Sequence, residues 1–122
     1  MMSDKKNILV VDDEEVIREF LYEVLSEDYS ISTATDGDEA IEQLKDESFD
    51  LVITDLKMKR VQGEEVVRFS NETNPASKVI VMSGYASLYS ASQSVNNGAY
   101  AFLSKPFTIQ ELISSVEGAL TA

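Results

Sequence analysis

Short hydrophobic runs alternate with longer amphipathic stretches along the whole chain. Five of these runs are rich in β-branched or aromatic residues and have the length of strands. They are residues 7–11, 29–34, 51–54, 78–82 and 100–104. Because runs that are apolar throughout are typical of strands covered on both faces, we expect a sheet that lies between layers of helices.

The amphipathic stretches predict five helices, over residues 16–25, 36–44, 64–73, 86–98 and 108–120. In most of them the apolar residues recur at spacings of three and four, which places them on one side of a helix. Asp36 and Thr108 are expected N-caps, because each is followed three residues later by a glutamate. The fourth stretch is rich in serine, so we expect the fourth helix to be the least firmly packed.

Strands and helices that alternate in this way favour an α/β fold with parallel strands. Right-handed crossovers then give an open, doubly wound sheet rather than an eight-fold barrel, since there are only five repeats. A chain of 122 residues fits one domain, so we expect residues 1–122 to fold as a unit with residues 1–6 as a polar leader.

The charge of the chain narrows the classes of partner. There are 10 lysines and arginines against 22 aspartates and glutamates, which gives a net charge of −12. This charge repels nucleic-acid backbones and anionic lipid head groups, so we expect no direct binding to nucleic acid or to a membrane. No run approaches membrane-spanning length and nothing resembles a signal peptide, which predicts a soluble cytoplasmic protein.

The chain contains no cysteine and no histidine. This composition excludes disulfides, thiolate or imidazole zinc sites, Ser-His-Asp triads and a phosphohistidine carrier. Any chemistry must therefore use Asp, Glu, Lys, Ser or Thr side chains.

Polar side chains follow four of the predicted strands. Asp12 and Asp13 end the first strand and Asp55 the third, while Ser83 and Lys105 end the fourth and the fifth. Ligands bind at the carboxyl ends of the strands in open parallel sheets, so we expect these side chains to converge at one edge. Taken singly, Asp13 could cap the first helix, and Asp55 and Ser83 could be turn residues. Lys105 alone could be a solvated surface lysine.

Together, the three carboxylates require positive charge. Each close pair repels by about 4 kcal/mol at an effective dielectric constant of about 20. Lys105 supplies one positive charge, and Mg²⁺, which prefers oxygen ligands, would supply the rest. Carboxylates, a hydroxyl and a lysine around Mg²⁺ predict a phosphoryl-transfer site in which one aspartate is the nucleophile.

Four motifs, in order along the chain, carry a resemblance to a known family. They are VVDDEE after the first strand, ITDLKM with Gly63 eight residues after Asp55, VMSGYA after the fourth strand and FLSKPF after the fifth. On these motifs the chain resembles the receiver domain of bacterial two-component response regulators, of the chemotaxis-regulator type, over essentially its whole length. The resemblance implies a flavodoxin-like (βα)5 fold with strand order 2-1-3-4-5.

The resemblance also implies roles for the acidic residues. Asp55 matches the phosphoacceptor, which takes a phosphoryl group from a sensor histidine kinase or a histidine phosphotransfer protein. Asp13, Asp55 and the backbone carbonyl of Lys57 would ligate Mg²⁺, with Mn²⁺ as a substitute, and Asp12 would hold the ion mainly through water. Such a domain catalyses its own phosphorylation and dephosphorylation, so we do not expect an enzyme that acts on other substrates.

Further residues match the switch of this family. Ser83 matches the hydroxyl that binds the phosphoryl group, Lys105 the lysine that pairs with it, and Phe102 the aromatic switch residue. Phosphorylation would change the surface formed by the fourth helix, the fifth strand and the fifth helix. The Lys-Pro peptide bond of relatives is typically cis, so we expect a cis bond before Pro106.

The chain departs from the family beside the acceptor. Lys59 stands where relatives usually have proline, and the segment KMKR is basic in an acidic protein. This segment is either a solvated loop or a site that docks a partner or steers phosphate. Lys57 and Tyr85 stand two residues beyond the phosphoacceptor and the switch hydroxyl. Our hypothesis is that these two bulky side chains slow the attack of water and lengthen the phosphorylated state.

Several functional alternatives remain open at this point. The domain could act on a downstream protein target or on its own output domain, and phosphorylation could drive a homodimer. The main alternative is a receiver fold that serves as a phosphorylation-independent docking or dimerisation module. A haloacid-dehalogenase-like phosphatase would need D-x-D, and a nucleotide-binding Rossmann domain would need G-x-G-x-x-G after the first strand; the sequence has neither at these positions.

Overall fold

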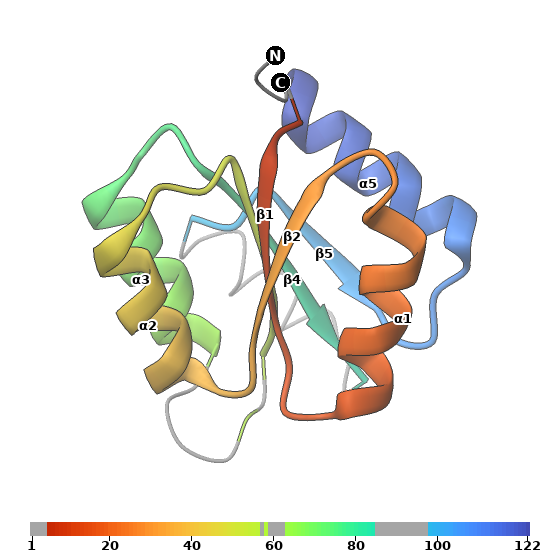
Figure 1. Cartoon of the computed structure of the whole chain (residues 1–122), viewed down its shortest axis with the longest axis horizontal. Coiled ribbons are helices and arrows are strands. Elements are labelled where there is room, and N and C mark those ends of the chain that lie inside the picture. The colour runs from red at the N-terminus through yellow and green to blue at the C-terminus, as the bar shows by residue number, and fades with distance from the viewer. Residues whose placement is uncertain (1–4, 57, 59–62, 85–97) are drawn as a thin grey trace.

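The computed structural model describes residues 5–56, 58, 63–84 and 98–122. Within them, five parallel strands form one sheet in the order β2-β1-β3-β4-β5. The strands are β1 (Asn7–Val11), β2 (Ser30–Ala34), β3 (Leu51–Asp55), β4 (Lys78–Ser83) and β5 (Ala101–Ser104). The five predicted strands and the strand order implied by the resemblance are both confirmed (Figure 1).

Helices cover both faces of this sheet. Those in the described part of the chain are α1 (Glu15–Leu25), α2 (Gly37–Asp46), α3 (Gly63–Thr73) and α5 (Ile109–Thr121). α1 and α5 lie on one face, and α2 and α3 lie on the other (Figure 1). None of these four combines the length and the apolar character that a membrane crossing requires. The predicted fourth helix and its expected loose packing fall almost wholly on residues 85–97, outside the described residues.

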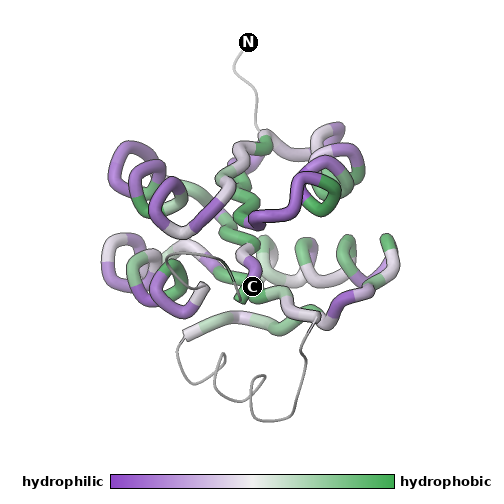
Figure 2. Tube along the Cα trace, turned by 90° about the horizontal axis from the view of Figure 1, so that it is seen from below, coloured by the Kyte–Doolittle hydropathy of each residue, from purple (hydrophilic) through white to green (hydrophobic). Residues whose placement is uncertain are grey.

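Alternation along the central strands builds two hydrophobic cores, one on each face of the sheet. In β1, Leu9 and Val11 belong to the core under α2 and α3, whereas Ile8 and Val10 belong to the core under α1 and α5. All four side chains are fully buried, because successive residues of a strand point to opposite faces and both faces are covered. In Figure 2 the strands through the middle are mostly hydrophobic, and the most hydrophilic helical turns lie on the outside.

Two helix starts follow the predicted capping chemistry. The backbone N–H of Glu39 donates to the Asp36 side chain at 2.9 Å. At the start of α5, the N–H of Glu111 donates to Thr108 Oγ1 at 3.0 Å, and the N–H of Thr108 donates to Glu111 Oε1 at 2.8 Å. This reciprocal capping box fixes where α5 begins, shortly after the end of β5.

Candidate functional site

The register of β1 and β3 brings the predicted carboxylates together. Val11 lies beside Thr54, so Asp12 and Asp55, the next residue along each strand, become neighbours. Asp13 follows in the loop that leads to α1. Carboxylate oxygens of Asp12, Asp13 and Asp55 lie within 4.8 Å of one another.

The three carboxylates differ in their exposure to solvent. Asp12 is fully buried, Asp55 is 6% exposed and Asp13 is half-buried. Closely spaced buried charges are unfavourable unless each has a partner of opposite charge or a hydrogen-bond donor. The cluster therefore depends on the groups that surround it.

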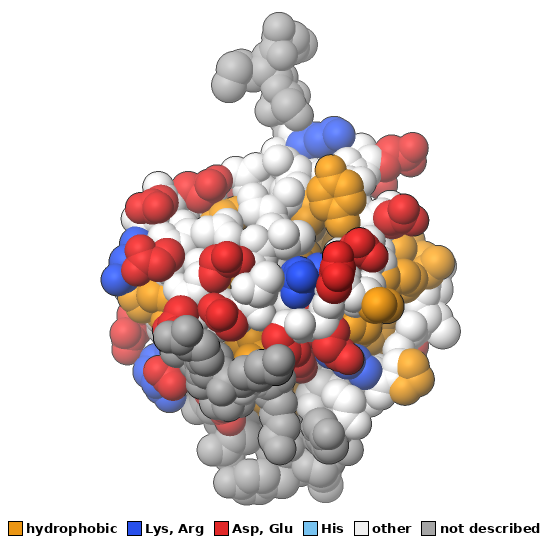
Figure 3. Space-filling view, turned by 60° about the horizontal axis from the view of Figure 1, so that its bottom comes forward, with side chains coloured by type: hydrophobic (Ala, Val, Ile, Leu, Met, Phe, Trp, Pro, Cys, Tyr) orange, Lys and Arg blue, Asp and Glu red, His pale blue; other side chains and the backbone are white. Residues whose placement is uncertain are grey.

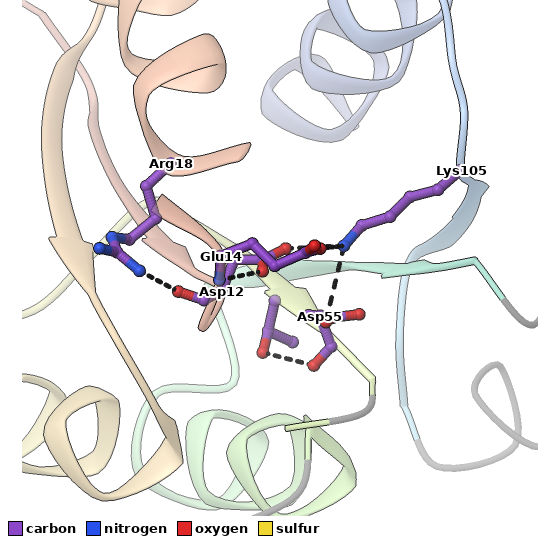
Figure 4. Close-up of polar contacts among 6 residues, drawn as sticks. Asp12, Glu14, Arg18, Asp55 and Lys105 are labelled. Carbon is purple, nitrogen blue, oxygen red and sulfur yellow. Dashed lines mark hydrogen bonds and ion pairs between the residues drawn. The ribbon is translucent and has the colours of Figure 1, made fainter. Parts of the chain in front are cut away.

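Lys105 reaches the carboxylates from the neighbouring end of β5. Ser83 pairs with Ser104 in the register of β4 and β5, and Lys105 follows directly. Its ammonium Nζ donates a hydrogen bond to Asp12 Oδ2 at 2.8 Å and lies 3.6 Å from Asp55 Oδ2 (Figure 4). The Lys105 side chain is only 14% exposed, so one ammonium links the ends of β1 and β3 from within the fold.

The acidic neighbours of Lys105 keep it charged. Burial alone would lower the pKa of Lys105, but the hydrogen bond to Asp12 and the attraction of Asp12, Asp55 and Glu14 together outweigh burial. The pKa of Lys105 is therefore raised above its ordinary value, and the side chain stays an ammonium throughout the neutral range.

The loop between β1 and α1 holds Asp12 in place. The N–H of Glu14 donates to Asp12 Oδ1 at 2.9 Å, and Arg18 Nη1 donates to the Asp12 carbonyl oxygen at 2.8 Å. Glu14 occupies the N-cap position of α1, so the interpretation of Asp13 as a helix cap is wrong. The contacts of Glu14 and Arg18 were not predicted from the sequence. Only their positions could have suggested these contacts, since Glu14 lies in the acidic run after the first strand and Arg18 lies one helical turn later.

Gly63, at the start of α3, packs directly against the backbone of the strand end. A Cβ at this position would collide with the Asp55 carbonyl oxygen and would lie 2.8 Å from Leu56 Cα. The Gly63 N–H also donates to the Leu56 carbonyl at 3.0 Å. Close approach of two backbones explains why a glycine stands eight residues after Asp55.

The remaining predicted residues lie in different parts of the chain. Ser83 is the buried last residue of β4, and Phe102 in β5 is half-buried against the core under α2 and α3. The peptide bond before Pro106 is cis, as predicted. Lys57 and Tyr85 lie outside the described residues, as does the rest of the basic KMKR segment except its methionine. The hypothesis on phosphoryl lifetime therefore stays a prediction.

The carboxylate oxygens at this edge of the sheet fit the ligand preference of a hard divalent cation. Three carboxylates with oxygens within 4.8 Å offer the anionic oxygen ligands that Mg²⁺ and Mn²⁺ take. Lys105 brings a single positive charge to them, so the cluster keeps an excess of negative charge. Further acidic side chains gather on the same face (Figure 3).

A partly apolar hollow of about 390 Å³ opens next to Lys105. It is lined by Ile17, Phe20, Gly84, Lys105, Pro106 and Phe107. The Phe20 and Phe107 rings lie with centroids 6.3 Å apart, and they join α1 to the segment before α5. The charged site thus borders a hollow with a largely apolar lining.

Known proteins resemble this chain over nearly its whole length. Residues 8–117 match the response regulator receiver domain family. The response regulator receiver protein CpdR of Brucella abortus is 31% identical over 118 residues, which is 96% of this chain and 98% of CpdR. A receiver domain protein (CheY-like) from Methanospirillum hungatei has a crystal structure that matches with a TM-score of 0.91 and 30% identity, over 97% of this chain and 95% of that one.

Other relatives are much longer than this chain. The transcriptional regulatory protein ZraR of Escherichia coli is 33% identical over 121 residues, which is 98% of this chain but 27% of ZraR. The chain thus spans about a quarter of that relative and nearly the full length of CpdR.

Proposed function

This chain belongs to the response regulator receiver domain family of two-component systems, and we propose that Asp55 accepts a phosphoryl group. The donor would be a phosphohistidine of a sensor histidine kinase or of a histidine phosphotransfer protein in the cytoplasm. The observation that carries the proposal is that Asp55 lies beside Asp12 with Lys105 in contact with both carboxylates.

Exposure and distance from Lys105 support Asp55 rather than Asp12 as the acceptor. Both carboxylate oxygens of Asp12 are engaged, one by the Glu14 N–H and the other by Lys105. Asp55 lies farther from the Lys105 ammonium, at 3.6 Å, and keeps some exposure to solvent. An incoming donor can therefore reach Asp55 without breaking the network around Asp12.

In the proposed reaction a carboxylate oxygen of Asp55 attacks the phosphorus of the phosphohistidine. A P–O bond forms as the P–N bond breaks, the electron pair stays on the imidazole nitrogen of the donor, and Asp55 becomes an acyl phosphate. Lys105 would pair with the transferred oxygens, and the Ser83 hydroxyl would donate a hydrogen bond to one of them. Attack of water on the phosphorus would later break the P–O bond to Asp55, release inorganic phosphate and restore the carboxylate.

The acidic cluster would hold a divalent cation during this reaction. Asp12, Asp13 and Asp55 supply side-chain ligands or hold its waters, and the Lys57 backbone carbonyl would be a further ligand. Bound Mg²⁺, or Mn²⁺ in its place, would supply positive charge that offsets the charge of the phosphoryl group.

The signal would leave the site through β5. Lys105 directly follows this strand, and Phe102, three residues earlier, lies in it and is half-buried. A phosphoryl group that draws Ser83 inward would make room for the Phe102 ring and change the surface of the fourth helix, β5 and α5. A downstream protein target, an output domain or a second copy of the chain would read this surface.

The test is the intact mass of the protein after incubation with Mg²⁺ and either a small acyl phosphate or phosphorylated histidine kinases. We expect a gain of one phosphoryl group that disappears in Asp55→Asn and in the presence of a chelator. Asp46→Asn, which removes an exposed carboxylate at the end of α2, should keep the gain and serves as the matched control.

Two outcomes would contradict the proposal. A gain of mass that persists in Asp55→Asn would place the acceptor elsewhere. No gain from any donor would favour a receiver fold used as a phosphorylation-independent docking or dimerisation module.

A further inference from the structure

Glu14 is an acidic residue of the β1–α1 loop whose side chain does not cap the helix. It stands at the N-cap position of α1, but its side chain makes no capping hydrogen bond. Glutamate is not among the residues favoured at this position. The side chain instead turns toward the site, where Oε1 lies 3.6 Å from Lys105 Nζ (Figure 4).

Three carboxylates contact the Lys105 ammonium, and their exposures differ. The side chain of Asp12 is 0% exposed, that of Asp55 is 9% exposed and that of Glu14 is 65% exposed. Asp12 and Asp55 therefore hold Lys105 from within the fold, and Glu14 holds it from the solvent side. Among these three carboxylates, Glu14 is therefore the one that meets solvent, and its charge lies at the exposed side of the Lys105 ammonium.

The contact of Glu14 is weak enough to break during the approach of a phosphoryl donor. Its 3.6 Å separation from Lys105 is longer than the 2.8 Å hydrogen bond of Asp12, and exposed ion pairs hold only loosely. The carboxylate can move away while Asp12 keeps its position. While the Glu14 carboxylate stays in place, it repels an incoming anion. This repulsion increases with the negative charge of the anion.

We propose that Glu14 is a positioning residue that holds Lys105 from the solvent side and admits phosphoryl donors according to their charge. This inference rests on the proposed function. A dianionic acyl phosphate is repelled more than a monoanionic phosphoramidate. A phosphohistidine resembles phosphoramidate in charge, because a proton on its imidazole offsets one negative charge of the phosphoryl group. Glu14 thereby favours donors with a P–N bond over free acyl phosphates.

The first test compares initial phosphorylation rates, read as intact mass, with acetyl phosphate and with phosphoramidate. Glu14→Gln keeps the backbone N–H that holds Asp12 and removes only the charge. We expect it to raise the rate with acetyl phosphate about fivefold at low ionic strength. The effect should be smaller with phosphoramidate and should shrink for both donors in high salt.

Glu15→Gln is the matched control. Glu15 is the exposed first residue of α1, and its replacement removes the same charge one residue further along the chain. It should change both rates by less than about twofold, because exposed charges act weakly at a distance. Equal effects of Glu14→Gln and Glu15→Gln, or a gain that is independent of donor charge, would overturn the selection of donors by charge.

The second test reads the contact itself without any donor. In protein labelled with 15N-lysine, the ammonium signal of Lys105 is assigned from its loss in Lys105→Arg. Glu14→Gln should speed the exchange of the ammonium protons with water, and Glu15→Gln should not. An unchanged signal would overturn the positioning role. If neither the wild type nor any variant accepts a phosphoryl group from any donor, the proposed function fails and the selection of donors fails with it. The ammonium signal of Lys105 would still decide whether Glu14 holds this side chain.

Discussion

At the scale of single residues, Asp12 is held through both its side chain and its backbone. Lys105 and the Glu14 N–H engage its two carboxylate oxygens, and Arg18 binds its carbonyl oxygen. These contacts come from the residue that follows β5, from the loop after β1 and from α1. The position of the Asp12 carboxylate is therefore set by three separate parts of the fold.

Loss of the contact between Arg18 and the Asp12 carbonyl should make the position of Asp12 less fixed. We expect Arg18→Ala to lower the free energy of unfolding by about 1–2 kcal/mol, because the hydrogen bond to the Asp12 carbonyl involves a charged donor. Phosphorylation should also slow, since Asp12 would be less well placed. The measurement is urea unfolding, with Arg68→Ala on the exposed side of α3 as the control, expected to change stability by about 0.5 kcal/mol or less. Equal losses in the two variants would contradict a role for Arg18 at the site.

The raised pKa of Lys105 predicts how stability depends on pH. A lysine whose pKa is higher in the folded state than its ordinary 10.5 stabilises the fold fully below that value. This contribution is lost as the pH rises through the higher, folded-state pKa. The difference in unfolding free energy between wild type and Lys105→Met should therefore be constant from pH 7 to pH 9 and shrink at more alkaline pH. A difference that stays constant up to pH 12 would show that the ammonium charge is not what stabilises the site.

The acidic residues of the site could be predicted from the sequence, but their contacts could not. Asp12, Asp55 and Lys105 are predictable because each follows an apolar run, and parallel strands bring their carboxyl ends to one edge. The contacts of Glu14 and Arg18 depend on the direction of the backbone in a short loop. No periodicity encodes that direction, and for the same reason the alternative role of Asp13 as the cap of α1 lay one residue before the observed N-cap, Glu14.

At the scale of the elements, the start of α3 is fitted to the end of β3. Gly63 leaves no room for a side chain between the helix and the Asp55 backbone. The sequence pointed to this glycine only through the family motif, because hydrophobic spacing does not report the distance between two backbones. The position of Asp55 is therefore coupled to the packing of a helix that carries none of the charged residues of the site.

A methyl group at position 63 should disturb both stability and chemistry. We expect Gly63→Ala to cost about 1–3 kcal/mol, because the added Cβ meets backbone atoms that cannot move aside freely. Phosphorylation of Asp55 should fall as well, since the Asp55 carbonyl must shift. Thermal unfolding and intact mass after phosphorylation would measure the two effects.

The same substitution at Gly118 is the matched control. This glycine lies inside α5, and a Cβ there would lie 3.3 Å from the hydroxyl of the exposed Tyr100, which can adjust. Gly118→Ala should leave stability unchanged or raise it by up to about 1 kcal/mol through helix propensity. Similar losses of stability at both positions would contradict the prediction that the close approach of two backbones at Gly63 makes an added Cβ unfavourable there.

At the scale of the whole molecule, two cores on one sheet support a strongly acidic surface. The apolar runs of β1 and β3 were sufficient to predict a sheet covered on both faces, and Ile8 to Val11 fill both cores as expected. The order of the strands came from the family resemblance, because hydrophobic periodicity does not encode which strands are neighbours. β2 lies at an edge, where only Ala34 of its residues is buried.

The net charge of −12 predicts that ions stabilise the fold. Sodium chloride should raise the melting temperature, because screening weakens repulsion among the acidic side chains. At equal ionic strength, Mg²⁺ at about one hundred times its dissociation constant should add about 2.7 kcal/mol more. Calorimetry of wild type and Asp13→Asn would separate the effects, since the variant should lose the gain from Mg²⁺ and keep the gain from sodium chloride. Equal gains from both salts in wild type would argue against a specific cation site.

The two ends of the described chain lie at the end of the sheet opposite the carboxylates (Figure 1). Lys5 and Lys6 before β1 line the same hollow as Leu120 and Thr121 at the end of α5. A tag or fluorescent reporter fused at either terminus would thus be attached far from Asp55. Protein captured through such a tag would present the carboxylate end of the sheet to the liquid, so the proposed phosphorylation of Asp55 could be assayed on immobilised protein.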